Sequence, residues 1–339
     1  MNRHLSQQVQ HLLRVAVCCA VPFSLQQSQV ATAADGVNAE LERIADAVDG
    51  TVGACAIHVE SGRTVAINGD VAFPMASTYK VPIAVRMLSL VDGGELSLDD
   101  MVDLQPGDLH PGSGIISRLL DDPGVSLSHR NLLELMLLIS DNSATDLCLQ
   151  AAGGGEDVTK HMQELGIEGL RVDRPTVRLI VDWLGLGDLD TGPEFRLADY
   201  REQVAGLTGE QRSQAAEAFD SDPRDTSTPV ASAKLLAMIQ RGEALQSQSN
   251  ALLLDIMHRC QTGADRLKGR LPEGTAVAHK TGTIGGTTND IGIITLPEQL
   301  GHVAVAVFVK ESSADVPDRE RAIAEVARSL YDYFLFSGR

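Results

Sequence analysis

Residues 274–312 have the sequence GTAVAHKTGTIGGTTNDIGIITLPEQLGHVAVAVFVKES, in which three apolar runs are separated by two turn-like segments. The runs are GTAVAHKTGTI, NDIGIITLP and HVAVAVFVKES, and they are rich in the β-branched residues that favour strands. Glycine and proline stand between them, as is typical of turns. The pattern predicts a series of strands near the end of the chain.

A second strand region lies near the start of the globular part. Residues 51–70, TVGACAIHVESGRTVAINGD, are typical of a hairpin with a tight ESGR turn. Between the two strand regions the periodicity is helical, notably from Ser77 to Leu90 and over residues 128–152, where two helices are expected to meet near Ser140. A final helix is expected over residues 318–336.

This order predicts the fold class. Strands at both ends and helices in the middle favour an α/β protein of the α+β type. We expect an antiparallel sheet of about five strands drawn from both chain ends, flanked by helices, with an inserted all-helical lobe. We expect the active site to lie between the sheet and this lobe.

Residues 1–33 have the features of a signal peptide. They contain Arg3 and Arg14 and no acid, and they continue with a short apolar run and the small residues Ala31-Thr32-Ala33. The run is too short to span a bilayer, so we expect no stable membrane insertion. Cleavage near Ala33 would leave a catalytic domain of residues 34–339, located in the periplasm or secreted.

The composition limits the partners. The formal net charge is −18, so nucleic acid is a poor partner, and an anionic substrate needs a local cation. Outside the signal segment three widely spaced cysteines remain, Cys55, Cys148 and Cys260, for which no disulfide is expected. No metal-ligand spacing occurs, so we expect neither a metal nor another cofactor. We expect the protein to be a monomer that acts on a small molecule.

The segment FPMASTYKVPIAVRML, residues 73–88, has a serine three positions before a lysine. Ser77 could be a helix N-cap and Lys80 a solvated charge. Alternatively, the two side chains share a helix face, so that the amine takes the proton of a nucleophilic hydroxyl. That role requires a lowered lysine pKa, from burial or from a second cation.

Two further motifs have the same ambiguity. Lys280, Thr281 and Gly282 on a predicted strand could supply the second cation, or could be an exposed strand end. The SDN tripeptide at residues 140–142 suits a capping turn as well as a site. Each motif alone is weak evidence for a catalytic site, whereas the three motifs together in one chain are strong evidence for one.

The order Ser-x-x-Lys, Ser-Asp-Asn, Lys-Thr-Gly resembles the class A serine β-lactamase family of the penicillin-recognising superfamily, as a divergent member. The resemblance covers most of residues 35–339. Supporting pieces are SDNSATDL, RDTSTP at 224–229 and KTGTIGGTTNDIGII at 280–294.

The resemblance implies catalytic and substrate-binding roles. Ser77 would attack the lactam carbonyl, Lys80 would take its proton, and Ser140 would pass a proton to the lactam nitrogen. The backbone N–H groups of Ser77 and Thr283 would form the oxyanion hole. The implied substrate-binding residues are Asn142 for the acylamide and Lys280, Thr281, Gly282 and Thr283 for the carboxylate.

The sequence departs from this family where deacylation is concerned. If Arg174 matches the loop arginine of the family, the deacylating glutamate falls on Thr176 and its partner asparagine on Ile180. Arg174 and Asp225 are 51 positions apart, so residues 175–224 contain an insertion. Possible replacement bases are Asp182, Asp188 and Glu194.

A carboxylate-binding arginine is also missing, since none lies between Lys280 and Asp318, and Lys310 is the nearby basic substitute. The function expected is a β-lactamase with slow deacylation. One alternative is a penicillin-binding, peptidase-like or esterase acyl-serine enzyme. The other is a non-catalytic binding module on the same scaffold.

Overall fold

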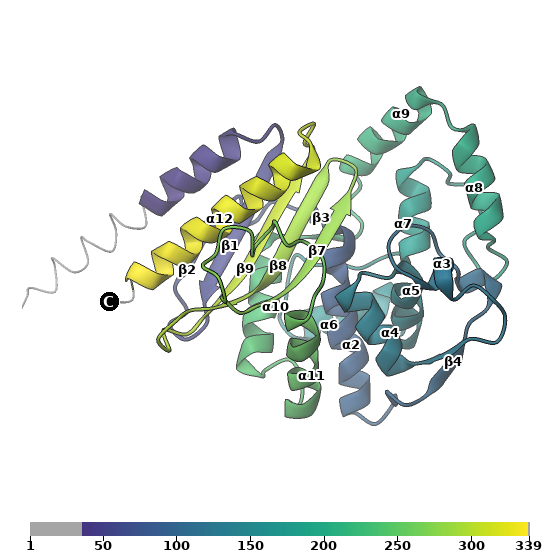
Figure 1. Ribbon diagram of the computed structural model, residues 1–339, viewed down its shortest axis with the longest axis horizontal. Coiled ribbons are helices and arrows are strands. Elements are labelled where there is room, and N and C mark those ends of the chain that lie inside the picture. Colours follow the sequence, from purple (N-terminus) through teal and green to yellow (C-terminus); the bar gives the residue numbers. More distant parts are fainter. Residues whose placement is uncertain (1–35, 338–339) are drawn as a thin grey trace, which may run out of the picture.

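The sheet is built from both ends of the chain, as the sequence predicts. In a computed structural model, which describes residues 36–337, five antiparallel strands lie in the order β2-β1-β9-β8-β7 (Figure 1). Their bounds are Thr51–His58 (β1), Thr64–Ile67 (β2), Val277–Ile284 (β7), Thr287–Thr295 (β8) and His302–Lys310 (β9). β1 pairs with β9 along its whole length, which joins the two strand regions. The predicted fold class is confirmed.

Helices cover both faces of the sheet (Figure 1). Val305 of β9 packs in one core with α12 (Val316–Ser337) and a helix over residues 36–46. Phe308 of β9 belongs to the core on the opposite face, where α10 (Pro229–Arg241) contacts the strand. Successive side chains of a strand point to opposite faces, so a strand covered on both sides is apolar throughout. This explains the run HVAVAVFV.

The lobe inserted between the strand regions is helical. Its main helices are α2 (Lys80–Asp92), α4 (His129–Leu138), α5 (Asn142–Ala151), α6 (Gly155–Glu164) and α11 (Ser247–His258). Its short elements are β3 (Phe73–Pro74) paired with β6 (Thr226–Ser227), β4 (Met101–Asp103) paired with β5 (Ser126–Ser128), η2 (Pro106–Asp108) and α3 (Ile116–Leu119). The predicted junction of two helices near Ser140 lies between α4 and α5.

The start of the helix predicted from Ser77 differs in detail. Residues Ala76–Tyr79 form a 3₁₀ turn, η1, and the α-helix begins only at Lys80. Ala76 has a φ of 45°, a left-handed conformation that a regular helix cannot contain. Pro82 lies in the first turn of α2, where its missing N–H costs no hydrogen bond.

The insertion at residues 175–224 consists mainly of three helices, α7 (Thr176–Trp183), α8 (Leu197–Gly206) and α9 (Gly209–Asp220). α7 packs on the lobe, with Val177 and Val181 buried. α8 has no buried residue, and Figure 1 shows α8 and α9 extending from the body as an arm. The broken periodicity of this segment reflects short helices that bury little surface.

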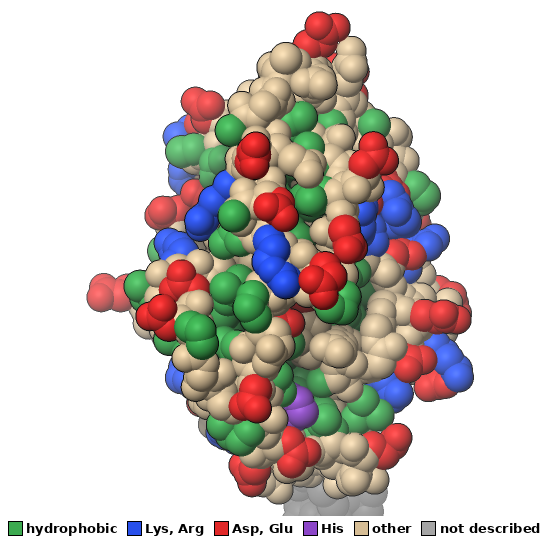
Figure 2. All heavy atoms as spheres, turned by 90° about the vertical axis from the view of Figure 1, so that its right-hand side faces the viewer, with side chains coloured by type: hydrophobic (Ala, Val, Ile, Leu, Met, Phe, Trp, Pro, Cys, Tyr) green, Lys and Arg blue, Asp and Glu red, His purple; other side chains and the backbone are tan. Residues whose placement is uncertain are grey.

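Figure 2 shows the face that carries this arm. Acidic side chains are spread over it, with basic ones between them, in keeping with the net charge of −18. None of the helices within residues 36–337 combines the length and the apolar character needed to cross a membrane. The predicted signal peptide, residues 1–33, lies outside the described residues and stays a prediction.

Candidate active site

Ser77 lies in the 3₁₀ turn η1, half-buried, directly before α2. No side chain caps η1 or α2, so the interpretation of Ser77 as an N-cap is wrong. The left-handed Ala76 turns the chain just before the serine. Residues with a strained backbone conformation, such as Ala76 beside Ser77, cluster at functional sites.

Lys80 is fully buried, and its amine is surrounded by oxygen acceptors. Its Nζ donates to the carbonyl O of Ser140 at 2.9 Å, to Ser140 Oγ at 3.0 Å and to Asn142 Oδ1 at 2.9 Å. Burial, together with the charge of Lys280, holds the pKa of Lys80 well below its usual value. The lowered pKa favours the neutral amine, which can accept a proton.

Ser140 joins this lysine to the second one. Lys280 Nζ donates to Ser140 Oγ at 3.1 Å and to the Thr281 carbonyl at 2.9 Å. Ser140 has a φ of 60°, a left-handed conformation. Its hydroxyl therefore bridges two buried amines that belong to α2 and β7.

Asp141 and Asn142 fix this junction. Asp141 is the N-cap of α5, and its carboxylate accepts the N–H groups of Ala144 at 3.0 Å and of Ile115 at 2.6 Å. Asn142 donates to the Pro111 carbonyl at 2.8 Å. The capping interpretation of the SDN motif is thus correct for Asp141, while Ser140 and Asn142 contact Lys80.

The edge strand β7 forms the opposite side of the site. Thr283 is exposed on it, whereas Thr281 and Gly282 are buried. A Cβ atom on Gly282 would lie 2.6 Å from the Met75 carbonyl O and 3.0 Å from the Ser77 nitrogen. The absence of a side chain at Gly282 lets β7 approach the backbone of Ser77, as an oxyanion hole shared by these segments requires.

Arg266 is a site residue that the sequence interpretation missed. Its Nη2 donates to Thr283 Oγ1 at 2.6 Å and its Nη1 to the Gly282 carbonyl at 3.0 Å. Arg266 precedes β7, whereas the carboxylate-binding arginine was expected after Lys280. The expected substitute, Lys310, instead lies over the Phe73 ring, 5.3 Å from its centre. The cation next to Thr283 is Arg266.

Asp146 is a second missed residue, although it belongs to the SDNSATDL segment. Its carboxylate accepts the N–H of Thr176 at 2.5 Å and that of Val177 at 3.0 Å. His110 Nδ1 lies 2.7 Å from the same carboxylate. Asp146 therefore anchors the first turn of α7 to α5, and its oxygens are occupied.

α7 crosses the site from the SDN side to the β7 side. Thr176, Ile180 and Trp183 are spaced by four and three residues and lie on one helix face. A Cβ atom added to Gly112 would lie 3.5 Å from Ile180 Cδ1 and 2.6 Å from the Asn142 amide nitrogen, so Ile180 is near the SDN motif. Trp183 Nε1 is 2.9 Å from the corresponding position on Gly285, in the β7–β8 turn. This face contains no titratable side chain.

The proposed replacement bases are not on that face. The Asp182 carboxylate accepts from Arg174 at 2.8 Å and from Arg178 at 2.7 Å. Burial alone would raise the pKa of Asp182, but these two arginines lower it below its usual value. Asp188 and Glu194 are exposed in the loop before α8.

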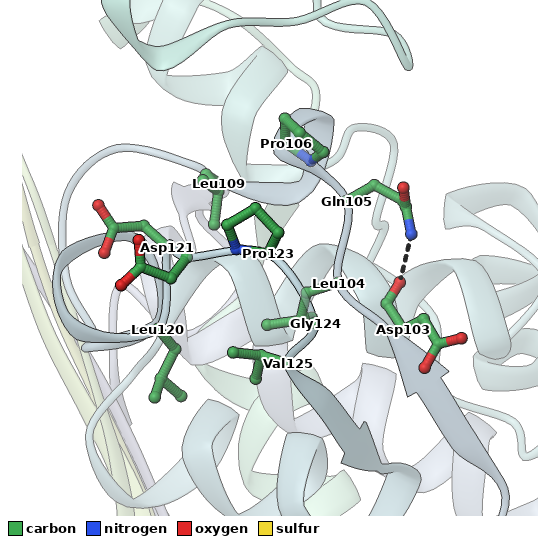
Figure 3. Close-up of a pocket in the computed structure, with 11 residues that line it drawn as sticks. Asp103, Leu104, Gln105, Pro106, Leu109, Leu120, Asp121, Pro123, Gly124 and Val125 are labelled. Atoms are coloured by element: carbon green, nitrogen blue, oxygen red, sulfur yellow. Dashed lines mark hydrogen bonds between the residues drawn. The ribbon is translucent and has the colours of Figure 1, made fainter.

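A separate hollow lies beside the paired strands β4 and β5 (Figure 3). Leu104, Leu109 and Val125 line it, and the carboxylates of Asp103 and Asp121 point outward. No serine, threonine, cysteine or lysine is among the residues that line it. Among residues 36–337, no group of three or more His, Cys, Asp or Glu could hold a metal ion. The lysine–serine network is therefore the candidate active site.

Comparison with known proteins agrees with this geometry. Residues 36–334 match the sequence profile of the β-lactamase enzyme family. The chain is 28% identical over 322 residues to β-lactamase VEB-1 of Pseudomonas aeruginosa, covering 92% of this chain and 94% of the relative. It is 29% identical over 303 residues to the extended-spectrum β-lactamase PER-1 of the same species, covering 87% and 86%.

A solved structure is similar over the same range. The crystal structure of a β-lactamase from Chitinophaga pinensis DSM 2588 has a TM-score of 0.71 and 30% sequence identity. The match covers 88% of this chain and 98% of the other. Sequence and fold therefore agree across nearly the whole described chain.

Proposed function

The chain belongs to the β-lactamase enzyme family, and on this basis we propose that it is a serine hydrolase that opens the β-lactam ring through an acyl-enzyme on Ser77. The observation that carries the proposal is the Ser140 hydroxyl, held at 3.0 Å from the Lys80 amine and 3.1 Å from the Lys280 amine. Two buried lysines that share one hydroxyl form a route for proton transfer.

Acylation follows from these positions. Neutral Lys80 takes the hydroxyl proton as Ser77 Oγ bonds to the lactam carbonyl carbon. The N–H groups of Ser77 and Thr283 stabilise the negative oxygen. When the carbon–nitrogen bond breaks, the Ser140 hydroxyl donates a proton to the lactam nitrogen. A neighbouring lysine then returns a proton to Ser140.

The substrate is a small anionic molecule. Its carboxylate would meet the ammonium group of Lys280 and the hydroxyls of Thr281 and Thr283. The buried Arg266 holds the Thr283 hydroxyl in place by donating a hydrogen bond to it. The Asn142 amide would bind the acylamide group, and Gly282 keeps β7 close to the nucleophile.

Deacylation is the slow step of the proposed cycle. It needs a base that activates a water against the acyl carbonyl. The α7 face across the site offers Thr176, Ile180 and Trp183, and none of these side chains is a base at neutral pH. This observation also favours a second candidate function, a penicillin-binding or peptidase-like acyltransferase that uses the same acyl-enzyme.

The non-catalytic binding module is the weakest of the three functions. A module without catalysis has no need for two buried lysines, because an uncompensated buried cation is costly. Both lysines are nevertheless fully buried and share Ser140. This arrangement supports a chemical function.

We also propose that the chain is exported as a monomer and cleaved near Ala33. The basic, apolar and small-residue segments of residues 1–33 support export. N-terminal sequencing of protein from the native host should begin within a few residues of Ala34. Size-exclusion chromatography with light scattering tests the monomer.

Intact mass spectrometry with benzylpenicillin tests the main proposal. The wild type should gain the mass of one penicillin, and Ser77→Ala should gain none. Lys80→Ala should acylate orders of magnitude more slowly, because the general base is removed. Labelling that survives in Ser77→Ala would disprove the assignment of the nucleophile.

A further inference from the structure

A second nucleophile lies next to the proposed active site. Cys260, which follows α11, is a buried free thiol. Its Sγ is 3.4 Å from Thr262 Oγ1, and Thr262 Oγ1 is 2.6 Å from Thr281 Oγ1. Two side-chain contacts therefore connect this thiol to a threonine proposed to hold the substrate carboxylate.

An imidazole and a carboxylate accompany the thiol. The ring of His279 bonds through Nδ1 to Asp290, at 2.9 and 3.0 Å from its two oxygens, and both side chains are fully buried. The His279 ring and the Cys260 thiol lie close enough for each to shift the pKa of the other. Nε2 is buried and has no hydrogen-bond partner of normal geometry among the described residues. A buried imidazole nitrogen without an acceptor is costly unless a thiolate or a ligand lies opposite it.

The electrostatics favour a charged pair. Burial alone would raise the pKa of the Cys260 thiol, but the side chain of His279, assisted by the charge of Lys280, lowers it to about 7. Burial alone would lower the pKa of His279, but Asp290 raises it to about 9. Both shifts favour the thiolate–imidazolium form of the pair.

Other titratable or charged groups lie on the segments that carry Cys260 and His279, and of these Lys280 acts on the thiol. His258 ends α11, Lys280 lies beside His279 on β7, and Arg266 precedes β7. No histidine acts on the other two thiols of the described chain, where burial outweighs the charge of Lys234 at Cys55 and of Lys80 at Cys148. Burial raises the pKa of Cys55 to about 12 and raises that of Cys148 as well.

We propose that Cys260, His279 and Asp290 form a reactive-thiol site that is modified by small electrophiles, and specifically by peroxides. Cysteine, histidine and aspartate are also common metal ligands. However, no group of three or more His, Cys, Asp or Glu among the described residues could hold a metal ion. The inference concerns a second nucleophile and does not depend on the hydrolase function.

The oxidation balances with peroxide as the oxidant. The thiolate sulfur attacks one peroxide oxygen, so that a sulfur–oxygen bond forms and the oxygen–oxygen bond breaks. Hydroxide leaves and takes the proton of the His279 imidazolium, which gives water. Cys260 becomes a sulfenic acid and the peroxide is reduced. The added oxygen is bonded to Sγ, which lies 3.4 Å from Thr262 Oγ1.

Alkylation by iodoacetamide, followed by peptide mapping, tests the site between pH 5.5 and 9. In the folded wild type we expect Cys260 to react with a midpoint near pH 7, and Cys55 and Cys148 to stay unmodified. In denaturant all three thiols should react with the ordinary midpoint of about 8.5. A folded-state midpoint near 8.5 at Cys260, or no reaction there, would overturn the proposal.

A second measurement covers the peroxide and the imidazole. Hydrogen peroxide with dimedone should give one adduct, on Cys260, and Cys260→Ser should give none. His279→Gln should slow the reaction of Cys260 at pH 7 at least about 10-fold, because most of the thiol would then be protonated. If His279→Gln fails to fold, the wild-type pH midpoint still decides the question. An adduct on another thiol, or no adduct, would contradict the proposal.

Discussion

The hydroxyl of Tyr79 shares a hydrogen bond with the hydroxyl of Thr176, with 2.5 Å between the two oxygens. Tyr79 lies in the turn that carries Ser77, and Thr176 is the first residue of α7. This contact, together with the bond from the Thr176 N–H to Asp146, fixes the position that we propose to match the deacylating glutamate of the family. The position is rigid, buried and lacks a base.

Single-turnover kinetics with benzylpenicillin should therefore show an accumulating acyl-enzyme. General-base assistance contributes about 10² to 10⁴ in rate, so deacylation should be slower than acylation by a factor of this order. Rapid-quench mass spectrometry measures both rates in one experiment. Deacylation as fast as acylation would show that another group, such as Asp182, activates the water.

Replacing Thr176 by Glu should not restore turnover by itself. A glutamate there would lie beside the Asp146 carboxylate, and two neighbouring carboxylates cannot both ionise easily. The double variant Thr176→Glu, Asp146→Asn removes this repulsion and keeps one of the two oxygen acceptors that bind the α7 backbone. We expect it to deacylate at least about 10-fold faster than Thr176→Glu. Equal rates would show that the backbone position, and not the charge, prevents deacylation.

The sequence predicted those parts of the molecule that depend on local pattern. The strands around Lys280 follow from alternating apolar and β-branched residues, and the junction at Ser140 follows from helix periodicity. Arg266 and Asp146 could not be predicted in the same way, because their roles depend on contacts across the fold. Arg266 reaches Thr283 from the preceding loop, and Asp146 binds α7 from another helix.

The insertion was recognised by its length but not by its structure. Arg174 and Asp225 form an ion pair at 2.6 Å although they are far apart in sequence. Between them the helices α8 and α9 bury almost no apolar residue, so they lack the periodicity by which helices are recognised.

Gly282→Ala should slow acylation by about 100-fold or more. The new methyl group would lie 2.6 Å from the Met75 carbonyl, so β7 and the Ser77 turn must move apart. A shift of about 1 Å in a reacting group can cost this factor. Gly206→Ala is the matched control, because a Cβ there meets nothing within 4 Å. Normal acylation in Gly282→Ala would show that the two segments separate without loss.

Arg266→Gln should weaken reaction with carboxylate-bearing substrates. Its donor to the Thr283 hydroxyl is lost, and a charged hydrogen bond is worth about 1.5 to 3 kcal/mol. We expect kcat/KM for benzylpenicillin to fall about 10-fold or more, and that for its methyl ester to change little. Lys310→Ala should leave both values unchanged, because its amine lies over Phe73. A larger effect of Lys310→Ala than of Arg266→Gln would reverse the assignment.

The rate of acylation should decline as the pH rises through about 8. Burial lowers the pKa of Lys280 to about 8, so this amine loses its charge within an accessible range. Below that pH the charged amine attracts the substrate carboxylate, and above it the attraction is lost. Lys80 must be neutral to act as a base, and burial together with the charge of Lys280 lowers its pKa and so favours the neutral amine.

The pH profile of kcat/KM reports groups of the free enzyme, so it can assign this decline. For benzylpenicillin the alkaline limb should have its midpoint near pH 8. For the methyl ester, which has no carboxylate to attract, the limb should be weaker. Lys280→Arg should move it upward, because a guanidinium stays charged throughout this range. The same alkaline limb in Lys280→Arg as in the wild type would assign the titration to another group, such as Cys260 or His279.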